Sequence, residues 1–424
     1  MSYKKIAACI YLENGKAITG FSDHKIIAES AVDLAVKYSN LGSDELIIFD
    51  LSDSDQEHEE ALGVIKEINR HIDIPVVGAG NIKRTEDVKK LLYAGCKKAA
   101  MNMAKQANID LIEEVSKRFG KEKIAVCADA EEQIIEHFEL LDTYCCGAIL
   151  LNSAPCKGYK SLSVIPVLND ITPEAIPEVL GNAGVAGVSG DAINFHIEDV
   201  MQIKNQCAAA GIEINTYTCA FSWSDFKLNS DGHVTVVVQD YKTAQVLMVA
   251  YMNEEAYQKT IETGRMTYYS RSRNELWLKG ETSGHFQYVK ELIADCDMDT
   301  ILAKVSQVGP ACHTGSTSCF FNEIMKKEYS DNNPLKVFEE VYAVIADRKI
   351  HPKEGSYTNY LFDKGVDKIL KKIGEEATEI VIAAKNPDKE EIKYEMSDFL
   401  YHAMVLMVEN GITWQDITKE LANR

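Results

Sequence analysis

The first half of the chain alternates short apolar runs with amphipathic segments of helical length. Such a run recurs eight times between Lys4 and Gly211, as "KIAACIYL", "ELIIFDL", "PVVGAG", "KKAAMN", "KIAVCAD", "GAILLNS", "IPVLND" and "GVAGVSG". Stretches such as "AESAVDLAVKYSNLG" lie between most of them and end in a glycine that suits a helix C-terminus. This alternation predicts a (β/α)8 barrel. The segment 154–164 is too short for a helix, so we expect one truncated unit in a barrel that is short for its class.

The pattern changes between about Thr216 and Glu323. The segment "HVTVVVQDYKTAQVLMVAYM" predicts strand, turn and strand, and "MTYYSRS", "ELWLKG", "HFQYVKELIADC" and "TILAKVSQVG" are also typical of strands. Between them, "NEEAYQKTIETG" predicts a short helix with Asn253 as N-cap and Gly264 at its end. These elements predict a compact α+β domain.

A polar linker, Met325 to Pro334, is followed by a wholly helical pattern. We expect Asn333 to cap the first helix, with Pro334 at its first position. Three further helices are predicted in "YLFDKGVDKILKKIGEEATEIVIAAKN", "KEEIKYEMSDFLYHAMVLMVENG" and "TWQDITKELANR". The chain is therefore expected to hold an α/β barrel over 1–215, an α+β domain over 216–325 and an all-α bundle over 333–424.

Composition narrows the class of protein. A length of 424 residues exceeds one ordinary core. A net charge of -20 without a long basic run argues against nucleic acid as a partner. No apolar run approaches the ~18 residues of a membrane span. The N-terminus is typical of a first strand and not of a signal peptide. Eleven scattered cysteines favour the cytoplasm, with thiols that are free or bound to metal.

Two stretches of the middle domain concentrate metal-ligand chemistry, and the first is "ADCDMDT". In an extended segment Asp295, Asp297 and Asp299 share one face, and Cys296 points to the other. Three adjacent carboxylates repel one another unless a hard cation such as Mg2+ lies among them.

The second stretch is "GPACHTGSTSCF", residues 309–320. Cys312 and Cys319, together with Cys296, make three thiolates, one fewer than a closed structural zinc site requires. Three thiolates with an open position would form a catalytic zinc site. His313 directly follows Cys312, and adjacent residues rarely reach the same ion. The alternative is free core cysteines beside a solvated acidic turn.

Carboxylates also recur at helical spacing in the last domain. Glu376 and Glu379 are three residues apart, and Glu375 and Glu379 are four apart. Glu395 and Asp398 repeat the three-residue spacing on the next predicted helix. If the two helices face each other, these carboxylates could hold Mg2+. Two solvated acidic faces are the alternative.

The middle-domain motifs "MNEEAYQKTIETGRMTYYSRSRNELWLKGETSGHFQYV", "DCDMD" and "GPACHTGSTSCF" closely resemble phosphoribosyl-AMP cyclohydrolase of histidine biosynthesis. The resemblance covers about 110 residues. It implies zinc on the three cysteines, Mg2+ on the three aspartates, and a homodimer whose zinc ligands come from two chains. It also implies hydrolytic opening of the adenine ring of phosphoribosyl-AMP between N1 and C6.

This resemblance identifies the metal ligands more clearly than the residues that transfer protons or bind phosphate. His313 is the first candidate to shuttle a proton and His285 the second, each with a structural role as the alternative. Candidate phosphate contacts, with a solvated strand face as the alternative, are Arg271, Ser272, Arg273 and Lys279.

The last domain resembles phosphoribosyl-ATP pyrophosphohydrolase over nearly all of Asn333 to Arg424. The resemblance implies Mg2+ on the four ligands Glu376, Glu379, Glu395 and Asp398, with Glu375 in support. The metal would neutralise the triphosphate of phosphoribosyl-ATP and help water to release pyrophosphate. Candidate phosphate contacts, with a solvated helix face as the favoured alternative for each, are Lys371, Lys372 and Arg348. The two resemblances point to consecutive steps of one pathway.

The barrel resembles the cyclase subunit of imidazole-glycerol-phosphate synthase and its sister isomerase, clearly over about residues 4–130. Tyr11 stands where those enzymes place an acid, although Asp129 could retain the opposing one. The phosphate loops are expected at 78–81 and 187–192. We therefore expect a degenerate barrel that acts as a dimer scaffold, a docking surface for other histidine-pathway enzymes, or a regulatory phosphate site. The rivals are a non-catalytic scaffold and an active three-step enzyme.

Overall fold

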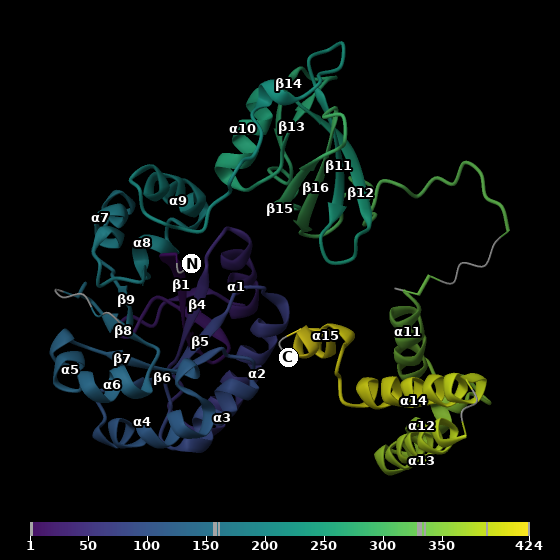
Figure 1. Cartoon of the computed structure of the whole chain (residues 1–424), viewed down its shortest axis with the longest axis horizontal. Coiled ribbons are helices and arrows are strands. Elements are labelled where there is room, and N and C mark those ends of the chain that lie inside the picture. The colour runs from purple at the N-terminus through teal and green to yellow at the C-terminus, as the bar shows by residue number, and fades with distance from the viewer. Residues whose placement is uncertain are drawn as a thin grey trace. The chain divides into compact units, whose positions relative to one another are not determined.

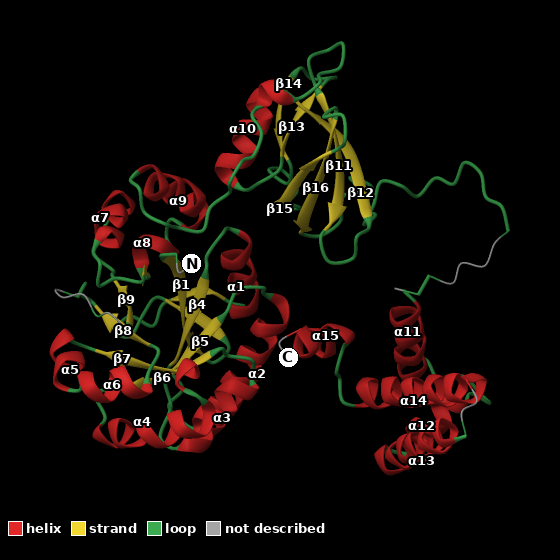
Figure 2. Ribbon diagram, in the orientation of Figure 1, coloured by secondary structure: helices red, strands yellow, loops and turns green. Residues whose placement is uncertain are grey.

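The computed structural model describes residues 3–155, 159, 162–328, 333–334, 336–386 and 389–422. The chain divides into two compact units, Met1–Glu323 and Ile324–Arg424. Figure 1 shows the order of the elements along the chain, and Figure 2 shows that the first unit mixes strands with helices whereas the second is helical. The predicted barrel and α+β domain both lie in the first unit, so the boundary between them near residue 215 stays a prediction.

The eight predicted barrel strands are confirmed. Each is followed in the sheet by the next parallel strand, and the bounds are β1 Lys5–Glu13, β4 Glu45–Asp50, β5 Val76–Ala79, β6 Lys98–Asn102, β7 Ile124–Ala128, β8 Gly147–Leu151, β9 Ser163–Val167 and β10 Gly187–Val188. A short hairpin that the sequence pattern did not reveal, β2 (Lys16–Ile18) and β3 (Ile26–Ala28), extends antiparallel from β1.

The sheet closes through its shortest strand. Strand β10 pairs with β1 in parallel, with Lys5 opposite Gly187. Single bridges link the same segment to β9, at Val164↔Val185 and Val167↔Ser189. The predicted truncation is therefore local: between β8 and β9 the described residues contain no helix, yet the barrel is not left open.

Two apolar layers hold the barrel together. Alternate strand residues, among them Cys9, Ile47 and Ile149, fill the interior. The intervening residues, such as Ile10 and Ile48, pack outward against the helices. Those helices are α1 Ala31–Asn40, α2 Asp55–His71, α3 Thr85–Tyr93, α4 Gln106–Phe119, α5 Glu131–Glu136, α6 Phe138–Tyr144, α7 Ile176–Gly181, α8 Asp191–Asn194 and α9 Val200–Ala209.

The α+β domain is built on a four-stranded sheet in the order β12-β11-β16-β15, with a separate two-stranded sheet of β13 and β14. The bounds match the predicted segments: β11 Val234–Asp240, β12 Val246–Met252, α10 Glu254–Thr263, β13 Thr267–Ser270, β14 Glu275–Leu278, β15 Gln287–Ala294 and β16 Thr300–Gln307. Asn253 caps α10 by accepting from the Ala256 N–H, and Gly264 ends it in the left-handed conformation, as expected.

The second unit is a bundle of α11 Val337–Ile350, α12 Tyr357–Lys364, α13 Val366–Lys385, α14 Lys389–Glu409 and α15 Trp414–Ala422. The single helix predicted from Tyr360 onward is wrong, because Gly365, at φ 77°, separates α12 from α13. The predicted start at Asn333 is also wrong. The Asn333 carbonyl accepts from the N–H groups of Lys336 and Val337 in a turn that precedes the helix.

Helices of membrane-spanning length and apolarity do not occur in the described part of the chain.

Candidate metal centres

The cysteine loop that follows β16 is tied to the start of β12. The Cys319 N–H donates to Leu247 O at 2.8 Å, and the Ser318 hydroxyl donates to Val246 O at 2.8 Å. At the other end of the loop, the Cys312 N–H donates to Ser316 O at 3.1 Å and closes a turn. These bonds fix the backbone on both sides of the thiols.

The two thiols of this loop lie beside each other. The Thr314 hydroxyl donates to Cys312 Sγ at 3.2 Å, and this bond is the main reason that the pKa of Cys312 lies below its usual value. Burial raises the pKa of Cys319, and the neighbouring Cys312 raises it further. A thiol of lowered pKa beside a second thiol is a donor pair that suits zinc.

The third predicted thiol lies elsewhere in the chain. Cys296 is exposed, in the turn after β15. Among the described residues, the groups of three or more His, Cys, Asp or Glu whose ligand atoms lie within 4.8 Å of one another do not include any of the three cysteines. One chain therefore offers Cys312 and Cys319 as a pair, with Cys296 apart from them.

The three aspartates do come together, although not for the predicted reason. Oxygens of Asp295, Asp297 and Asp299 lie within 4.8 Å of one another, and all three residues are exposed. The segment is a turn and not an extended strand, and Met298 has a φ of 65°. Desolvation raises the pKa of Asp295, but bonds from the N–H groups of Thr300 and Asp299 outweigh it and leave that pKa lowered.

The two candidate histidines lie at the cysteine loop. His313 is exposed, and its Nδ1 is 3.9 Å from Cys312 Sγ. The ring of His285 packs against Gly309, where a Cβ would lie only 2.7 Å from the ring Cδ2. His313 therefore lies beside a thiol, and His285 lies against the start of the loop.

Only some of the predicted phosphate contacts share a pocket. Arg271 and Ser272 line a pocket of about 550 Å³ whose walls carry Tyr251 and Trp277. The Arg271 guanidinium stacks on the Tyr251 ring at 3.7 Å. Arg273 instead pairs with Glu275, at 3.3 Å.

Lys279 lies outside that pocket. It is buried, and its Nζ donates to Ala311 O at 2.7 Å, one residue before Cys312. The structure therefore places this side chain at the cysteine loop.

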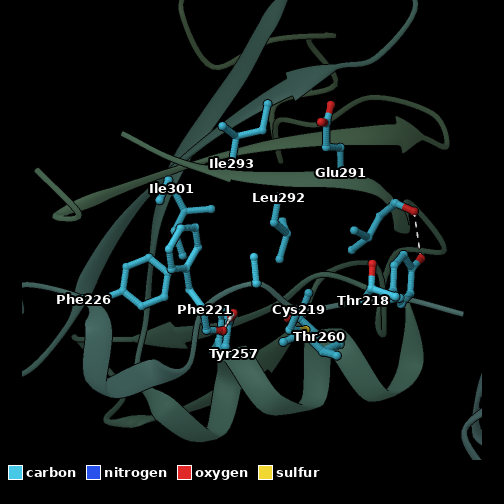
Figure 3. A pocket seen from close by; sticks show the side chains of 15 residues that line it. Thr218, Cys219, Phe221, Phe226, Tyr257, Thr260, Glu291, Leu292, Ile293 and Ile301 are labelled. Atoms are coloured by element: carbon cyan, nitrogen blue, oxygen red, sulfur yellow. Dashed lines mark hydrogen bonds between the residues drawn. The ribbon is translucent and has the colours of Figure 1, made fainter. Parts of the chain in front are cut away.

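A second pocket in the same domain is mainly apolar. It encloses about 340 Å³ between α10, β15 and the segment that precedes β11. Figure 3 shows Phe221, Phe226, Tyr257 and Ile301 lining it. Its walls hold none of the predicted metal ligands, so we do not assign the chemistry to it.

In the helical unit, helices α13 and α14 bring carboxylates together. Oxygens of Glu376, Glu395 and Asp398 lie within 4.8 Å of one another. Burial raises the pKa of Glu395, and the neighbouring carboxylates of Glu379, Glu376 and Asp398 raise it further. This crowding of negative charge is what a divalent cation relieves, so the residues fit a Mg2+ site.

The expected phosphate-binding lysine in this unit is already paired. Lys372 Nζ lies 2.9 Å from carboxylate oxygens of both Glu375 and Glu376. The hydrogen bonds that the Lys372 ammonium donates to these two carboxylates raise the pKa of Lys372 above its usual value. Its positive charge is therefore shared between two carboxylates.

Two residues next to the cluster were missed by the sequence reasoning. His402 is buried, its Nδ1 is 2.8 Å from Asp398 O and 3.7 Å from Glu376 Oε1, and its Nε2 is 3.1 Å from the Tyr357 hydroxyl. The signal was the four-residue spacing between Asp398 and His402, which puts both on one helix face.

Three aromatic rings gather at Tyr11 of the barrel. Tyr11 stacks on Phe49 with ring centroids 5.2 Å apart, and Phe21 meets both rings edge-on. Asp129 is exposed. In the second predicted phosphate loop, burial raises the pKa of Asp191, and the negative charge of Asp170 adds to it. Asp191 within this loop and Asp170 beside it oppose the binding of an anion.

Three family models match separate parts of the chain. Residues 248–321 match the family model of phosphoribosyl-AMP cyclohydrolase, and 338–424 match that of phosphoribosyl-ATP pyrophosphohydrolase. Residues 5–150 match a model described as histidine biosynthesis protein.

Full-length relatives match the second half of the chain. The histidine biosynthesis bifunctional protein HisIE of Thermoanaerobacter pseudethanolicus is 54% identical over 209 residues, which is 46% of this chain and 97% of the relative. HisIE of Bacillus subtilis is 49% identical over 200 residues, 47% of this chain and 95% of the relative. The matches cover the cyclohydrolase and pyrophosphohydrolase parts.

These folds and matches define a hydrolase with two active domains. The chain belongs to the HisIE family of bifunctional histidine-biosynthesis proteins and carries phosphoribosyl-AMP cyclohydrolase and phosphoribosyl-ATP pyrophosphohydrolase activities. An additional barrel of the histidine-biosynthesis type precedes the part shared with these relatives.

Proposed function

We propose that the helical unit releases pyrophosphate from phosphoribosyl-ATP and that the α+β domain then opens the adenine ring of the resulting phosphoribosyl-AMP. The observation that supports this division is that each unit has its own cluster of metal-ligand side chains. The thiols and the aspartate turn lie in the domain matched by the cyclohydrolase model, and the glutamates lie in the bundle matched by the pyrophosphohydrolase model.

Zinc and Mg2+ are the proposed metals. Cys312 and Cys319, with Cys296 of a second chain, would hold zinc, because soft thiolates favour that ion. The oxygen clusters of the turn and of the bundle would hold Mg2+. When bound, zinc supplies a water of lowered pKa, and Mg2+ offsets phosphate charge.

The residues around the metals would bind the substrate and move protons. The tyrosines and Arg271 in the pocket beside β13 offer an aromatic wall and a guanidinium, which suit a nucleotide base and a phosphate. His313, exposed and 3.9 Å from Cys312 Sγ, remains the proposed proton carrier, with His285 second. Ser272 and Arg273 stay predicted phosphate contacts.

Substitution of one thiol tests the division of labour. Cys312→Ser is expected to abolish ring opening and to leave pyrophosphate release unchanged, because it removes a zinc ligand from one domain only. Both steps are measured on the full chain, by the phosphoribosyl-AMP consumed and the pyrophosphate released. Cys219→Ser, in the exposed part of the same domain, is the matched control. Loss of both activities in Cys312→Ser would contradict the proposed independence of the domains.

Metal removal gives a second test. After treatment with a chelator we expect neither step to proceed. Zinc alone should then restore no pyrophosphate release, and Mg2+ alone should restore it, because the cluster of Glu376, Glu395 and Asp398 offers carboxylate oxygens to the metal. Restoration of pyrophosphate release by zinc and not by Mg2+ would contradict the assignment.

A shared zinc site implies a homodimer, since Cys296 does not join the other two thiols within one chain. Cys296→Ser and Cys312→Ser should each lack ring opening. When the two variants are expressed together, mixed dimers contain one complete ligand set, so part of the activity should return. No recovery, with mixed dimers shown to form, would mean that each chain completes its own site.

For the barrel we propose a degenerate fold without the ancestral reaction, with a scaffold or docking role for other histidine-pathway enzymes. The support is the aromatic cluster at Tyr11 and the carboxylate of Asp191 in the second predicted phosphate loop, with Asp170 beside it. Consumption of a cyclase or isomerase substrate by the full chain would overturn this and favour a three-step enzyme. The cytoplasm stays the predicted compartment.

A further inference from the structure

The turn after β14 supports the cysteine loop at two points. This turn, 279–285, reads "KGETSGH". At its start, the Lys279 ammonium donates to Ala311 O at 2.7 Å. At its end, the His285 ring fills the space beside Gly309. The residues that lead into Cys312 are therefore held from one side by this turn.

Lys279 is unusual among lysines because it is only 7% exposed. A buried ammonium is costly unless it is paired and hydrogen-bonded. Burial lowers the pKa of Lys279, and the negative charges of Cys319 and Cys312 oppose that effect. The position of this ammonium is set by its hydrogen bond to Ala311 O, the carbonyl that directly precedes Cys312.

We propose that Lys279 is a positioning residue of the zinc centre, which fixes Cys312 through Ala311 O and balances the charge of the two thiolates, and is not a contact for substrate phosphate. The inference rests on the proposed zinc site. Three thiolates around Zn2+ carry one net negative charge, and a single buried ammonium neutralises it. A lysine that already donates to a buried carbonyl has less freedom to reach a phosphate in solution.

The location of Arg271, another positively charged side chain of this domain, supports the positioning role of Lys279. Arg271, which stacks on Tyr251, lines the open pocket where a phosphate can be reached. Lys279 is absent from the walls of that pocket. The phosphate-binding and thiolate-balancing tasks are therefore assigned to different residues.

Lys279→Met in the full chain tests the proposal. Because outer contacts of a metal site typically change affinity or activity about 10- to 100-fold, we expect zinc retention against a chelator and kcat for ring opening to fall by that order. The KM for phosphoribosyl-AMP should change little, and pyrophosphate release on the same chain should stay normal. Full zinc retention together with a raised KM would overturn the proposal and restore the phosphate role.

Two further variants complete the experiment. Lys279→Arg keeps a charged donor and is expected to retain zinc better than Lys279→Met; equal loss in both would also overturn the proposal. If Lys279→Met does not fold, Lys279→Gln takes its place, and its zinc retention is compared with that of Lys279→Arg in the same way. Lys259→Met, on the half-exposed side of α10, should behave like the wild type. Zinc in the wild type is measured first, so that a failure of the zinc assignment itself is recognised separately.

Discussion

Single residues at the two centres act through the groups they touch. Thr314 lowers the pKa of Cys312 by one hydrogen bond, whereas the carboxylates around Glu395 raise the pKa of that side chain. Although the two pKa shifts are opposite in direction, both favour the binding of a metal ion. The thiol is prepared to lose its proton, and the crowded carboxylates gain most when a cation arrives.

His402 is expected to orient the carboxylate cluster of the bundle. Its ring connects the Tyr357 hydroxyl with the carbonyl of Asp398, beside Glu376. His402→Ala should lower pyrophosphate release by about 10- to 100-fold, the usual effect of removing an outer contact of a metal site. Ring opening serves as the internal control, and His351→Ala, at an exposed site in the same unit, is the matched variant. Unchanged pyrophosphate release in His402→Ala would contradict this role.

At the scale of elements, turns decide where the ligands lie. The hairpin turn between β15 and β16 gathers three aspartates, and the cysteine loop is held between β12 and the turn after β14. Gly365 divides what reads as one helix into α12 and α13. In the α+β domain the candidate metal ligands therefore lie on the turn between β15 and β16 and on the loop after β16, whereas those of the bundle lie on helices α13 and α14.

Two glycines of the cysteine loop allow a comparison of steric contact with backbone strain. Both have positive φ, 61° at Gly309 and 88° at Gly315. A Cβ on Gly309 would also meet the His285 ring at 2.7 Å, whereas one on Gly315 would meet nothing within 4 Å. Gly309→Ala should therefore reduce ring opening and zinc retention more than Gly315→Ala. Equal effects would show that only the backbone conformation matters.

At the scale of the molecule, the barrel contacts the α+β domain within the first unit. Asp73 of the barrel accepts a hydrogen bond from the Tyr241 hydroxyl, and its oxygens lie 3.2 Å from Lys242 Nζ and 3.7 Å from Lys290 Nζ. Burial raises the pKa of Asp73, but these partners outweigh it and hold the pKa below its usual value. The contact gives the barrel a physical connection to the catalytic domain.

The stability conferred by Asp73 should depend on pH. Because its pKa is lower in the folded protein, its contribution is present above the unfolded pKa of about 4 and is lost as pH falls through the folded pKa. Asp73→Asn should unfold at a lower temperature than the wild type at pH 7, and the difference should shrink below about pH 4. The difference in unfolding temperature between Asp73→Asn and the wild type is measured on the full chain from pH 7 down to below about pH 4. Asp129→Asn is the control. A difference that persists in acid would contradict this account.

The sequence by itself determined the order and type of the elements. Period-two and period-3.6 patterns are local, so the barrel strands and the strands of the α+β domain could be recognised without coordinates. The carboxylate spacing on α13 and α14 is local in the same sense. Local patterns failed where one glycine or one turn decided the outcome, as at Gly365 and at the start of α11.

Only the tertiary structure decided which distant residues meet. Closure of the barrel depends on the two-residue strand β10, whose partner β1 lies at the opposite end of the barrel sequence. The burial of Lys279 at Ala311, the separation of Cys296 from the other thiols, and the position of His402 are likewise long-range facts. Spacing along a chain reports which residues share a face, whereas burial and pairing depend on what the fold packs against that face.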